Sequence, residues 1–392
     1  MTAIRYSILL LLIFGSAVRA QDAQPTGAFI VRLGTDTTAV ERFTRAGTTY
    51  QIEQALRSPR TSLRHTHLEL APTGEIATIF LMHHRIDNPA GPLLASTQLT
   101  YTGGDSGTVE IKRGDTASSR KVVARRAGIP SLAQSFLAYE LIAMRMRASG
   151  ADSMDVTLVN PSGDPTQVVV RRIGADSMTF RLPFLTYRAH VDSTGRILHL
   201  YQPRGTAVER VANVDVNAIA SAWAALDASG KGMGPLSPRD SVSARVGDAS
   251  ITINYARPSK RGRVIFGNIV PWDTVWRTGA NDATIFTTDR DLIIGGQVVP
   301  AGSYSLFTLP TRSRTRLILN RETMRNGEPL AGTEYDASKD FARIPMNTKR
   351  LTTPVQQLTI EIVPRGNRES VLRIAWDDRE MTVGIRPRSV RR

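Results

Sequence analysis

The chain has 392 residues, a formal net charge of +15 at pH 7 and no cysteine. The absence of thiols excludes disulfide bonds, cysteine catalysis and thiolate metal sites. Hydrophobic residues make up 41% of the chain, which is enough apolar material for the cores of two ordinary domains. The positive charge favours anionic partners in general, and the arginines are scattered as on a solvated basic surface.

The first twenty residues have the pattern of a cleaved signal peptide. Arg5 gives a positive start, residues 8–14 are an unbroken apolar run, and small residues precede Ala20. This run is shorter than the roughly 20 apolar residues of a membrane-spanning helix, and no later segment is long and apolar enough to span one. We therefore expect an exported chain, cleaved near Ala20 and located in the periplasm or outside the cell, with no transmembrane segment and no nucleic-acid partner.

Alternating apolar and polar residues predict antiparallel strands through most of the N-terminal half, residues 27–213. Residues 61–70 and 76–85, for example, flank a turn that contains proline and glycine. One helix interrupts the strands over residues 132–148, where apolar residues recur at helical spacing. We expect a curved sheet with this helix against its concave face, similar in outline to the half-barrel of lipoprotein carriers. Such a sheet packages its own helix or holds an apolar ligand.

A helix and a linker, residues 214–235, separate this half from the C-terminal one. Asp215 can cap the helix, and the glycines from Gly230 onward end it. Residues 236–387 contain about seven or eight short strands with regular turn signals, which is typical of a β-sandwich or jelly-roll. A basic tail, residues 388–392, follows. The predicted fold class is mainly β, with a curved antiparallel sheet and one helix followed by a β-sandwich domain.

Three segments of the C-terminal half carry a family resemblance. They are residues 255–267 (YARPSKRGRVIFG), residues 270–284 (with VWRTGAND) and residues 295–310 (with PAGSYSLFTLP). In this order they resemble the bacterial domain-of-unknown-function family 2911, and the likeness covers about residues 236–387. The resemblance implies an exported bacterial protein with a β-rich domain and no assigned activity. Residues 321–332 depart from the family pattern as a more polar loop.

The densest cluster of binding-type side chains lies in the first two of these segments. Arginine forks bind carboxylate or phosphate bidentately, and a tryptophan beside them can stack on a sugar ring. If the fold brings the two segments together, they form a basic, aromatic-lined pocket for an anionic or carbohydrate ligand. The alternative is a structural role, in which the arginines donate hydrogen bonds to loop carbonyls. The cluster comprises Tyr255, Arg257, Lys260, Arg263, Trp276, Arg277 and Asn281.

A second candidate site lies in the N-terminal half. His65, His67 and Glu69 alternate, so a strand places them on one face, and pairing about the following turn brings His83 close to them. Such a set can bind zinc or a similar divalent ion. Alternating polar residues are also the pattern of the solvent face of a half-buried strand, in which case no cofactor is expected.

No pattern predicts catalytic residues. All six histidines lie at or before His199, so the C-terminal domain cannot hold a Ser-His-Asp triad of its own. The sequence therefore favours a non-enzymatic binding or interaction protein of the bacterial envelope. A metal-assisted hydrolase that uses the histidine cluster is the first alternative, and a purely structural role is the second. The sequence does not predict the ligand or the oligomeric state.

Overall fold

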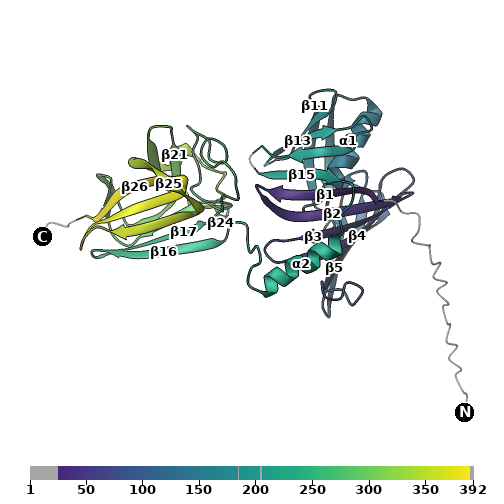
Figure 1. The fold of residues 1–392 in the computed structure, drawn as a ribbon, viewed down its shortest axis with the longest axis horizontal. Coiled ribbons are helices and arrows are strands. Elements are labelled where there is room, and N and C mark those ends of the chain that lie inside the picture. Colours follow the sequence, from purple (N-terminus) through teal and green to yellow (C-terminus); the bar gives the residue numbers. More distant parts are fainter. Residues whose placement is uncertain (1–24, 184, 204, 389–392) are drawn as a thin grey trace, which may run out of the picture.

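Two large sheets, one in each half of the chain, dominate the fold (Figure 1). The computed structural model describes residues 25–183, 185–203 and 205–388. The predicted signal peptide and the last four residues of the predicted basic tail lie outside these ranges. Within them, no helix is long and apolar enough to cross a membrane. The predicted fold class is confirmed, because strands predominate in both halves and only two α-helices are present in the described residues.

The described part of the N-terminal half contains fifteen strands. In chain order they are β1 (Pro25–Leu33), β2 (Asp36–Ala46), β3 (Thr49–Leu56), β4 (Ser62–Leu70), β5 (Ile76–His84), β6 (Ala95–Gly103), β7 (Ser106–Arg113), β8 (Thr116–Val123), β9 (Ile129–Pro130), β10 (Ser153–Val159), β11 (Pro165–Arg172), β12 (Ser177–Arg181), β13 (Thr186–Val191), β14 (Ile197–Tyr201) and β15 (Thr206–Val211). They form one sheet in the order β8-β7-β6-β5-β4-β3-β2-β1-β15-β14-β13-β12-β11-β10-β9. Neighbouring strands run antiparallel except β9 and β10, which are parallel.

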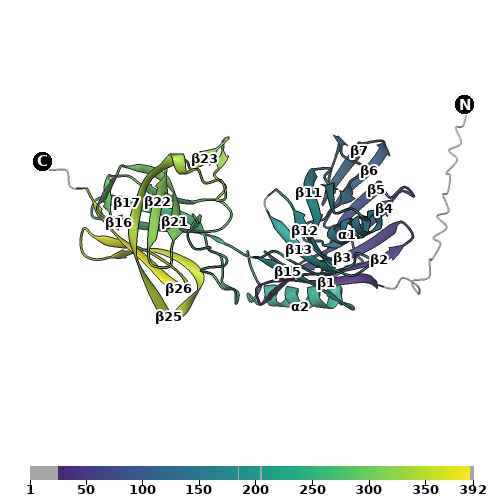
Figure 2. The ribbon, with the colours of Figure 1, turned by 90° about the horizontal axis from the view of Figure 1, so that it is seen from above.

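The sheet curves around the helix α1 (Leu137–Ser149), whereas α2 (Val216–Ala228) lies on the outer side (Figure 2). Strand residues alternate between the two faces, so one set points towards α1 and the other towards α2. Phe29, Phe43 and Ile52 belong to the larger core on the concave face. Burying each such side chain contributes about 1.5–3 kcal/mol, so this set stabilises the packing of the sheet against α1.

The inner helix begins five residues later than the sequence predicts. Leu132 accepts a hydrogen bond from the backbone N–H of Ser135 (3.1 Å), and Gln134 has a positive φ of 60°, so this stretch forms a turn instead of a helix. The apolar spacing predicts that Leu137, Leu141 and Met144 share the buried face, but Leu141 and Met144 are only partly buried, whereas Ile142 and Met146 are buried with Leu137. The apolar pattern alone does not predict where the helix begins, because a residue on a strand of the sheet determines the start of α1.

That residue is Glu41 on β2, a carboxylate buried in the concave core. Its Oε1 accepts hydrogen bonds from the backbone N–H groups of Phe136 and Leu137 (both 3.3 Å), which caps the start of α1 from outside the helix. Burial raises the pKa of Glu41 to about 7, although these hydrogen bonds act in the opposite direction. A carboxyl group that is half protonated near neutral pH therefore joins the sheet to the helix.

A second buried carboxylate fastens the other side of α1. Glu140 forms an ion pair with Arg210 on β15 and accepts a hydrogen bond from the backbone N–H of Ile197 (2.9 Å). Arg210 also donates from Nε to the carbonyl oxygen of Ile197 (2.7 Å). These polar contacts hold the helix at one register within an otherwise apolar interface, because a shifted helix would lose the backbone hydrogen bonds to Glu41 and the ion pair of Glu140.

The outer helix α2 covers the opposite face of the sheet. Its N-cap is Asp215, whose side chain accepts a hydrogen bond from the N–H of Ala218 (2.9 Å). Val216 and Ala220 pack against a small convex core that includes Leu63 on β4. Near the end of the helix, Asp227 accepts from the backbone N–H of Thr61 (2.7 Å), so the start of the linker to the C-terminal half is fixed on the N-terminal sheet.

Nine strands of the described C-terminal half form the second sheet. They are β16 (Arg239–Val246), β17 (Ala249–Ala256), β18 (Thr284–Thr288), β19 (Leu292–Ile294), β20 (Gln297–Val299), β21 (Gly302–Pro310), β22 (Thr315–Asn320), β25 (Asp340–Pro364) and β26 (Ser370–Pro387). Their order is β16-β17-β18-β21-β22-β25-β26-β19-β20, around a core that includes Trp376 and Phe286. The short β23 (Met324–Arg325) and β24 (Glu328–Pro329) pair separately, before the 3-10 turn η1 (Ala337–Lys339). The length of β25 and β26 was not predicted.

The Glu41 contact predicts a specific pH dependence of stability. The folded-state pKa of about 7 lies above the unfolded value near 4.5, so the stabilising contribution is complete at low pH and is lost as the pH rises through 7. We expect the free energy of unfolding of the wild type to lose about 2–3 kcal/mol more than that of Glu41→Gln between pH 5 and pH 8. Denaturant titrations of both proteins measure this difference, and equal pH slopes would contradict it.

Candidate ligand cleft between the two halves

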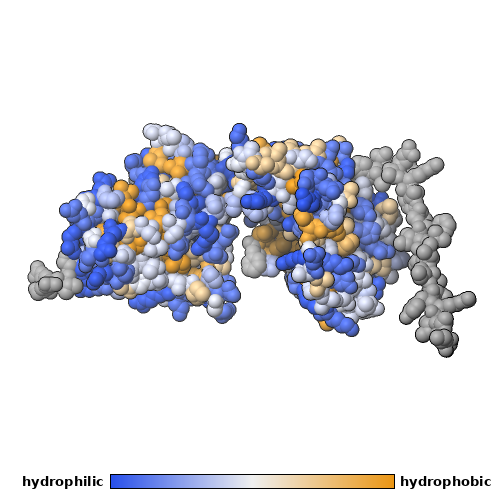
Figure 3. All heavy atoms as spheres, turned by 90° about the horizontal axis from the view of Figure 1, so that it is seen from below, coloured by the Kyte–Doolittle hydropathy of each residue, from blue (hydrophilic) through white to orange (hydrophobic). Residues whose placement is uncertain are grey.

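A cavity of about 1000 Å³ lies between the two sheets. The space-filling view shows the two halves as lobes with a hollow between them on one face (Figure 3). Residues of both halves line the cavity. The sequence of either half, considered by itself, does not predict a shared cavity. The N-terminal half supplies Leu33, Ser58, Pro59 and Gln202, and the C-terminal half supplies, among others, Arg263, Trp276, Arg277, Asn281, Gly332, Thr333, Tyr335 and Trp376.

The turn between β1 and β2 fastens the N-terminal sheet to the C-terminal half. The backbone N–H of Thr35 donates to the carbonyl oxygen of Arg261 (3.0 Å), and the Arg261 guanidinium forms an ion pair with Asp36. Gly34 has a φ of 64°, and a Cβ at this position would lie 1.9 Å from the same Arg261 oxygen. Only glycine therefore satisfies both the backbone conformation and the close approach.

Two residues of the predicted ligand cluster hold the C-terminal sheet together instead of lining the cleft. Tyr255 is buried, and its hydroxyl oxygen accepts from the N–H of Ile360 (3.1 Å). Arg257 donates to the carbonyl oxygen of Leu358 (3.1 Å) and forms an ion pair with Asp240, as the structural alternative predicts.

Two more members of the cluster also have internal partners. Lys260 forms an ion pair with Asp377 on β26. Arg263 lines the cleft, but it donates to the carbonyl oxygens of Lys260 (3.0 Å) and Ser259 (2.6 Å) within its own loop. Its guanidinium is therefore largely used in holding the loop at residues 259–263.

Arg277 is different. No hydrogen bond or ion pair involves its side chain in the part of the chain that the structure describes, and its Nε is buried without a partner. Burial lowers the pKa of this guanidinium. Gly332 makes room for it, because a Cβ there would lie 2.1 Å from the Cδ of Arg277. A positive group in a half-desolvated position without a counter-ion is a ready partner for an anion.

The remaining members of the cluster lie beside Arg277. Trp276 is almost fully buried and stacks on Trp376, with ring centroids 5.8 Å apart and an interplanar angle of 20°. Asn281 is exposed at the cleft and has a positive φ of 61°. The structure thus brings Arg263, Trp276, Arg277 and Asn281 to one cavity and leaves the other three residues of the cluster outside its lining.

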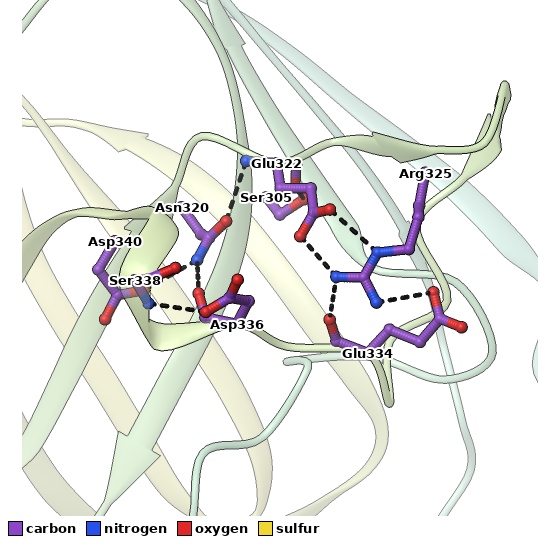
Figure 4. Close-up of polar contacts among 8 residues, drawn as sticks. All are labelled: Ser305, Asn320, Glu322, Arg325, Glu334, Asp336, Ser338 and Asp340. Carbon is purple, nitrogen blue, oxygen red and sulfur yellow. Dashed lines mark hydrogen bonds and ion pairs between the residues drawn. The ribbon is translucent and has the colours of Figure 1, made fainter.

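The polar loop that departs from the family pattern leads into one wall of the cleft, which Gly332, Thr333 and Tyr335 line. Asn320 donates to the carbonyl oxygen of Asp336 (2.8 Å) and to Asp340 (3.0 Å), while its own oxygen accepts from the N–H of Glu322 (2.9 Å). Arg325 lies between Glu322 and Glu334 and interacts with both (Figure 4). This network holds the loop so that its residues 332–335 face Arg277, and sequence patterns gave no sign of that proximity.

The predicted metal cluster does not assemble as expected. His83 pairs with Arg64 across β4 and β5, so it lies on the concave face, whereas His65, His67 and Glu69 lie on the convex face. The prediction that His83 joins them is wrong by one residue of register. The imidazole that does approach His65 belongs to His84, with ring centroids 4.3 Å apart. Across the described ranges, no group of three or more His, Cys, Asp or Glu is arranged to hold a metal ion.

By fold and site, the chain is a two-part, β-rich protein with a basic, tryptophan-lined cleft between its parts. Residues 237–385 match the model of a family described as a protein of unknown function (DUF2911). The predicted resemblance is therefore confirmed for the C-terminal part of the chain. No curated protein matches the chain.

Two solved structures show a distant similarity. A DUF1089 family protein from Pseudomonas aeruginosa is 11% identical with a TM-score of 0.31, and the match covers 42% of this chain and 90% of that one. A β-barrel-like protein of the domain of unknown function DUF1849 from Brucella abortus is 8% identical with a TM-score of 0.27, covering 48% of this chain and 97% of that one.

Arg257 has hydrogen-bond partners and Arg277 has none in the described residues, so we expect their mutation to change the free energy of unfolding differently. Arg257→Gln removes hydrogen bonds across the sheet, and we expect it to lower the free energy of unfolding by about 1–3 kcal/mol. Arg277→Gln removes an unpaired, partly desolvated charge, so stability stays within about 0.5 kcal/mol or rises. Denaturant unfolding of the two variants in parallel tests this, and a larger loss for Arg277→Gln would contradict the assignment.

The contact between the halves can be tested with a matched pair of glycines. Gly34 and Gly47 both have a positive φ, of 64° and 61°, but a Cβ at Gly47 would meet nothing within 4 Å. Alanine therefore costs the same backbone strain at both positions, and the clash with Arg261 is added only at Gly34. We expect Gly34→Ala to be less stable than Gly47→Ala by about 1–3 kcal/mol and to increase the radius of gyration in solution scattering. Equal values for the two variants would rule out this contact.

Proposed function

We propose that this chain is an exported, non-enzymatic binding protein of the bacterial cell envelope, and that the cleft between its halves is the ligand site. The observation that carries the proposal is Arg277, which faces the cavity without a partner among the described residues. The pattern of the first twenty residues supports export.

The chemistry of the cleft favours an anionic or carbohydrate ligand. A guanidinium with free N–H groups binds a carboxylate or phosphate through two parallel hydrogen bonds. Asn281, Gln202 and Thr333 add neutral polar groups that suit hydroxyls, and the tryptophan pair gives an apolar wall against which a sugar ring can lie. A volume of about 1000 Å³ is at the upper end of the range for small-molecule sites. An acidic sugar combines all of these features.

Neither alternative has comparable support. A metal-assisted hydrolase requires at least three ligands at one place, and no group of three or more His, Cys, Asp or Glu in the described residues is arranged to hold a metal ion. A purely structural role explains Arg257, Lys260 and Arg263, whose partners are internal. It gives no reason for the desolvated and unpaired guanidinium of Arg277.

The experiment uses glucuronate as a probe, because it joins a carboxylate to a sugar ring. Tryptophan fluorescence reports binding, since Trp276 and Trp376 both line the cleft. We expect a saturable change with glucuronate that is weaker with glucose or acetate alone. The Arg277→Gln variant should weaken glucuronate binding by at least about tenfold, which corresponds to loss of a charge-assisted pair.

The matched control is Arg316→Gln, which changes an exposed arginine on β22 that does not line the cleft. It lowers the net charge by the same amount and should leave glucuronate binding unchanged. No saturable binding by the wild type, or equal losses in Arg277→Gln and Arg316→Gln, would refute the cleft as a site for acidic sugars.

A further inference from the structure

A row of mostly polar side chains crosses six strands, β2 to β7, on the concave face of the N-terminal sheet. Glu41 pairs with Gln54, Gln54 with Arg64, Arg64 with His83, His83 with Ala95, and Ala95 with Arg113. Directly opposed residues of antiparallel strands point to the same face, with Cβ atoms about 4.5–5.5 Å apart. The register therefore gathers residues from β2, β3, β4, β5 and β7 that no sequence motif connects.

The acidic end of this row is already occupied. Glu41 accepts hydrogen bonds from the start of α1 and from the Nε2 of Gln54 (3.1 Å). Beyond it the ionisable groups of the row are all basic, namely Arg64, His83 and Arg113. Neither arginine side chain takes part in a hydrogen bond or ion pair within the described residues. The pKa of His83 is lowered by burial, and next by the charge of Arg64.

Two buried donors in this region lack partners. The Nε of Arg64 and the hydroxyl of Thr66 are inaccessible to solvent and make no hydrogen bond in the described part of the chain. Thr66 lies two residues from Arg64 on the same strand, so both side chains are on the same face. Buried polar groups in folded proteins are nearly always hydrogen-bonded, so two such donors beside each other indicate an acceptor that the chain itself does not supply.

We propose that Arg64, His83 and Arg113 bind a small oxyanion, a phosphate or a phosphate monoester or diester, on the concave face of the N-terminal sheet. The anion accepts from the guanidinium N–H groups of both arginines and from the imidazole. Arg113 is exposed and Arg64 is half-buried, so the site opens to solvent at the end of β7. It belongs to the N-terminal half alone, and it differs from the cleft in its residues and its strands.

The test is calorimetric titration of the full mature chain with inorganic phosphate at constant ionic strength. All measurements are made in an Arg277→Gln background, so that the cleft does not contribute and failure of the proposed cleft site leaves this test unaffected. We expect saturable binding with one site per chain. Arg64→Gln and Arg113→Gln should each weaken it by at least about tenfold, because each removes one charge-assisted pair.

Lys112→Gln is the control, because Lys112 is the neighbour of Arg113 on β7 but points to the opposite face. It should not change phosphate binding. Arg64→Lys keeps the charge without the fork and should give intermediate affinity, and melting curves identify any variant that fails to fold. The proposal is overturned if phosphate does not bind in the Arg277→Gln background, or if Lys112→Gln weakens binding as much as Arg64→Gln.

Vesicles of phosphatidylcholine with and without phosphatidylglycerol distinguish the source of the phosphate. Binding to the anionic vesicles that depends on Arg64 and Arg113 identifies a lipid headgroup as the ligand. Binding of inorganic phosphate with the same dependence, but no vesicle binding, identifies a free phosphate compound. Either result supports the site.

Discussion

The approach of the β1–β2 turn to the backbone of Arg261 is the contact on which the cleft depends. One hydrogen bond to the Arg261 carbonyl oxygen and one ion pair to Asp36 set how close the two halves lie. The absence of a side chain at Gly34 permits that distance, since any Cβ would overlap the acceptor. The cavity between the halves exists because the contact occupies one edge of the interface and leaves the region around Arg277 open. A few polar atoms therefore control whether residues from both halves share one site.

The arginines of the C-terminal half divide into two groups by their partners. Arg257 donates to a carbonyl oxygen and a carboxylate on strands far from it in the sequence, and Arg263 donates to two carbonyl oxygens of its own loop. Arg277 has the same chemical group and the same neighbourhood, but its donors remain unused in the described residues. Desolvation without a partner costs free energy, and a protein retains such a cost where a ligand offsets it. The candidate site is therefore identified by the unpaired guanidinium of Arg277 and not by the density of positive charge.

Sequence patterns predicted the fold class, both helices and the family resemblance, because periodicity and turn residues are local signals. Sequence patterns did not predict features that depend on a residue far away in the chain. The start of α1 depends on Glu41, nearly a hundred residues earlier, and the structural role of Tyr255 depends on Ile360, about a hundred residues later. The face on which His83 lies depends on register, where a shift of one residue reverses every side chain. The same limit hid the contribution of Gln202 to the cleft, because the two halves had been considered separately.

A crystal structure of the full chain grown with glucuronate is the most direct measurement of the central claim. The account predicts density for the ligand between the two halves, with its carboxylate within hydrogen-bond distance of the Arg277 guanidinium and Trp276 still stacked on Trp376. A structure in which Arg277 has turned onto a carboxylate or carbonyl of the chain, with the cleft closed or empty, would contradict it.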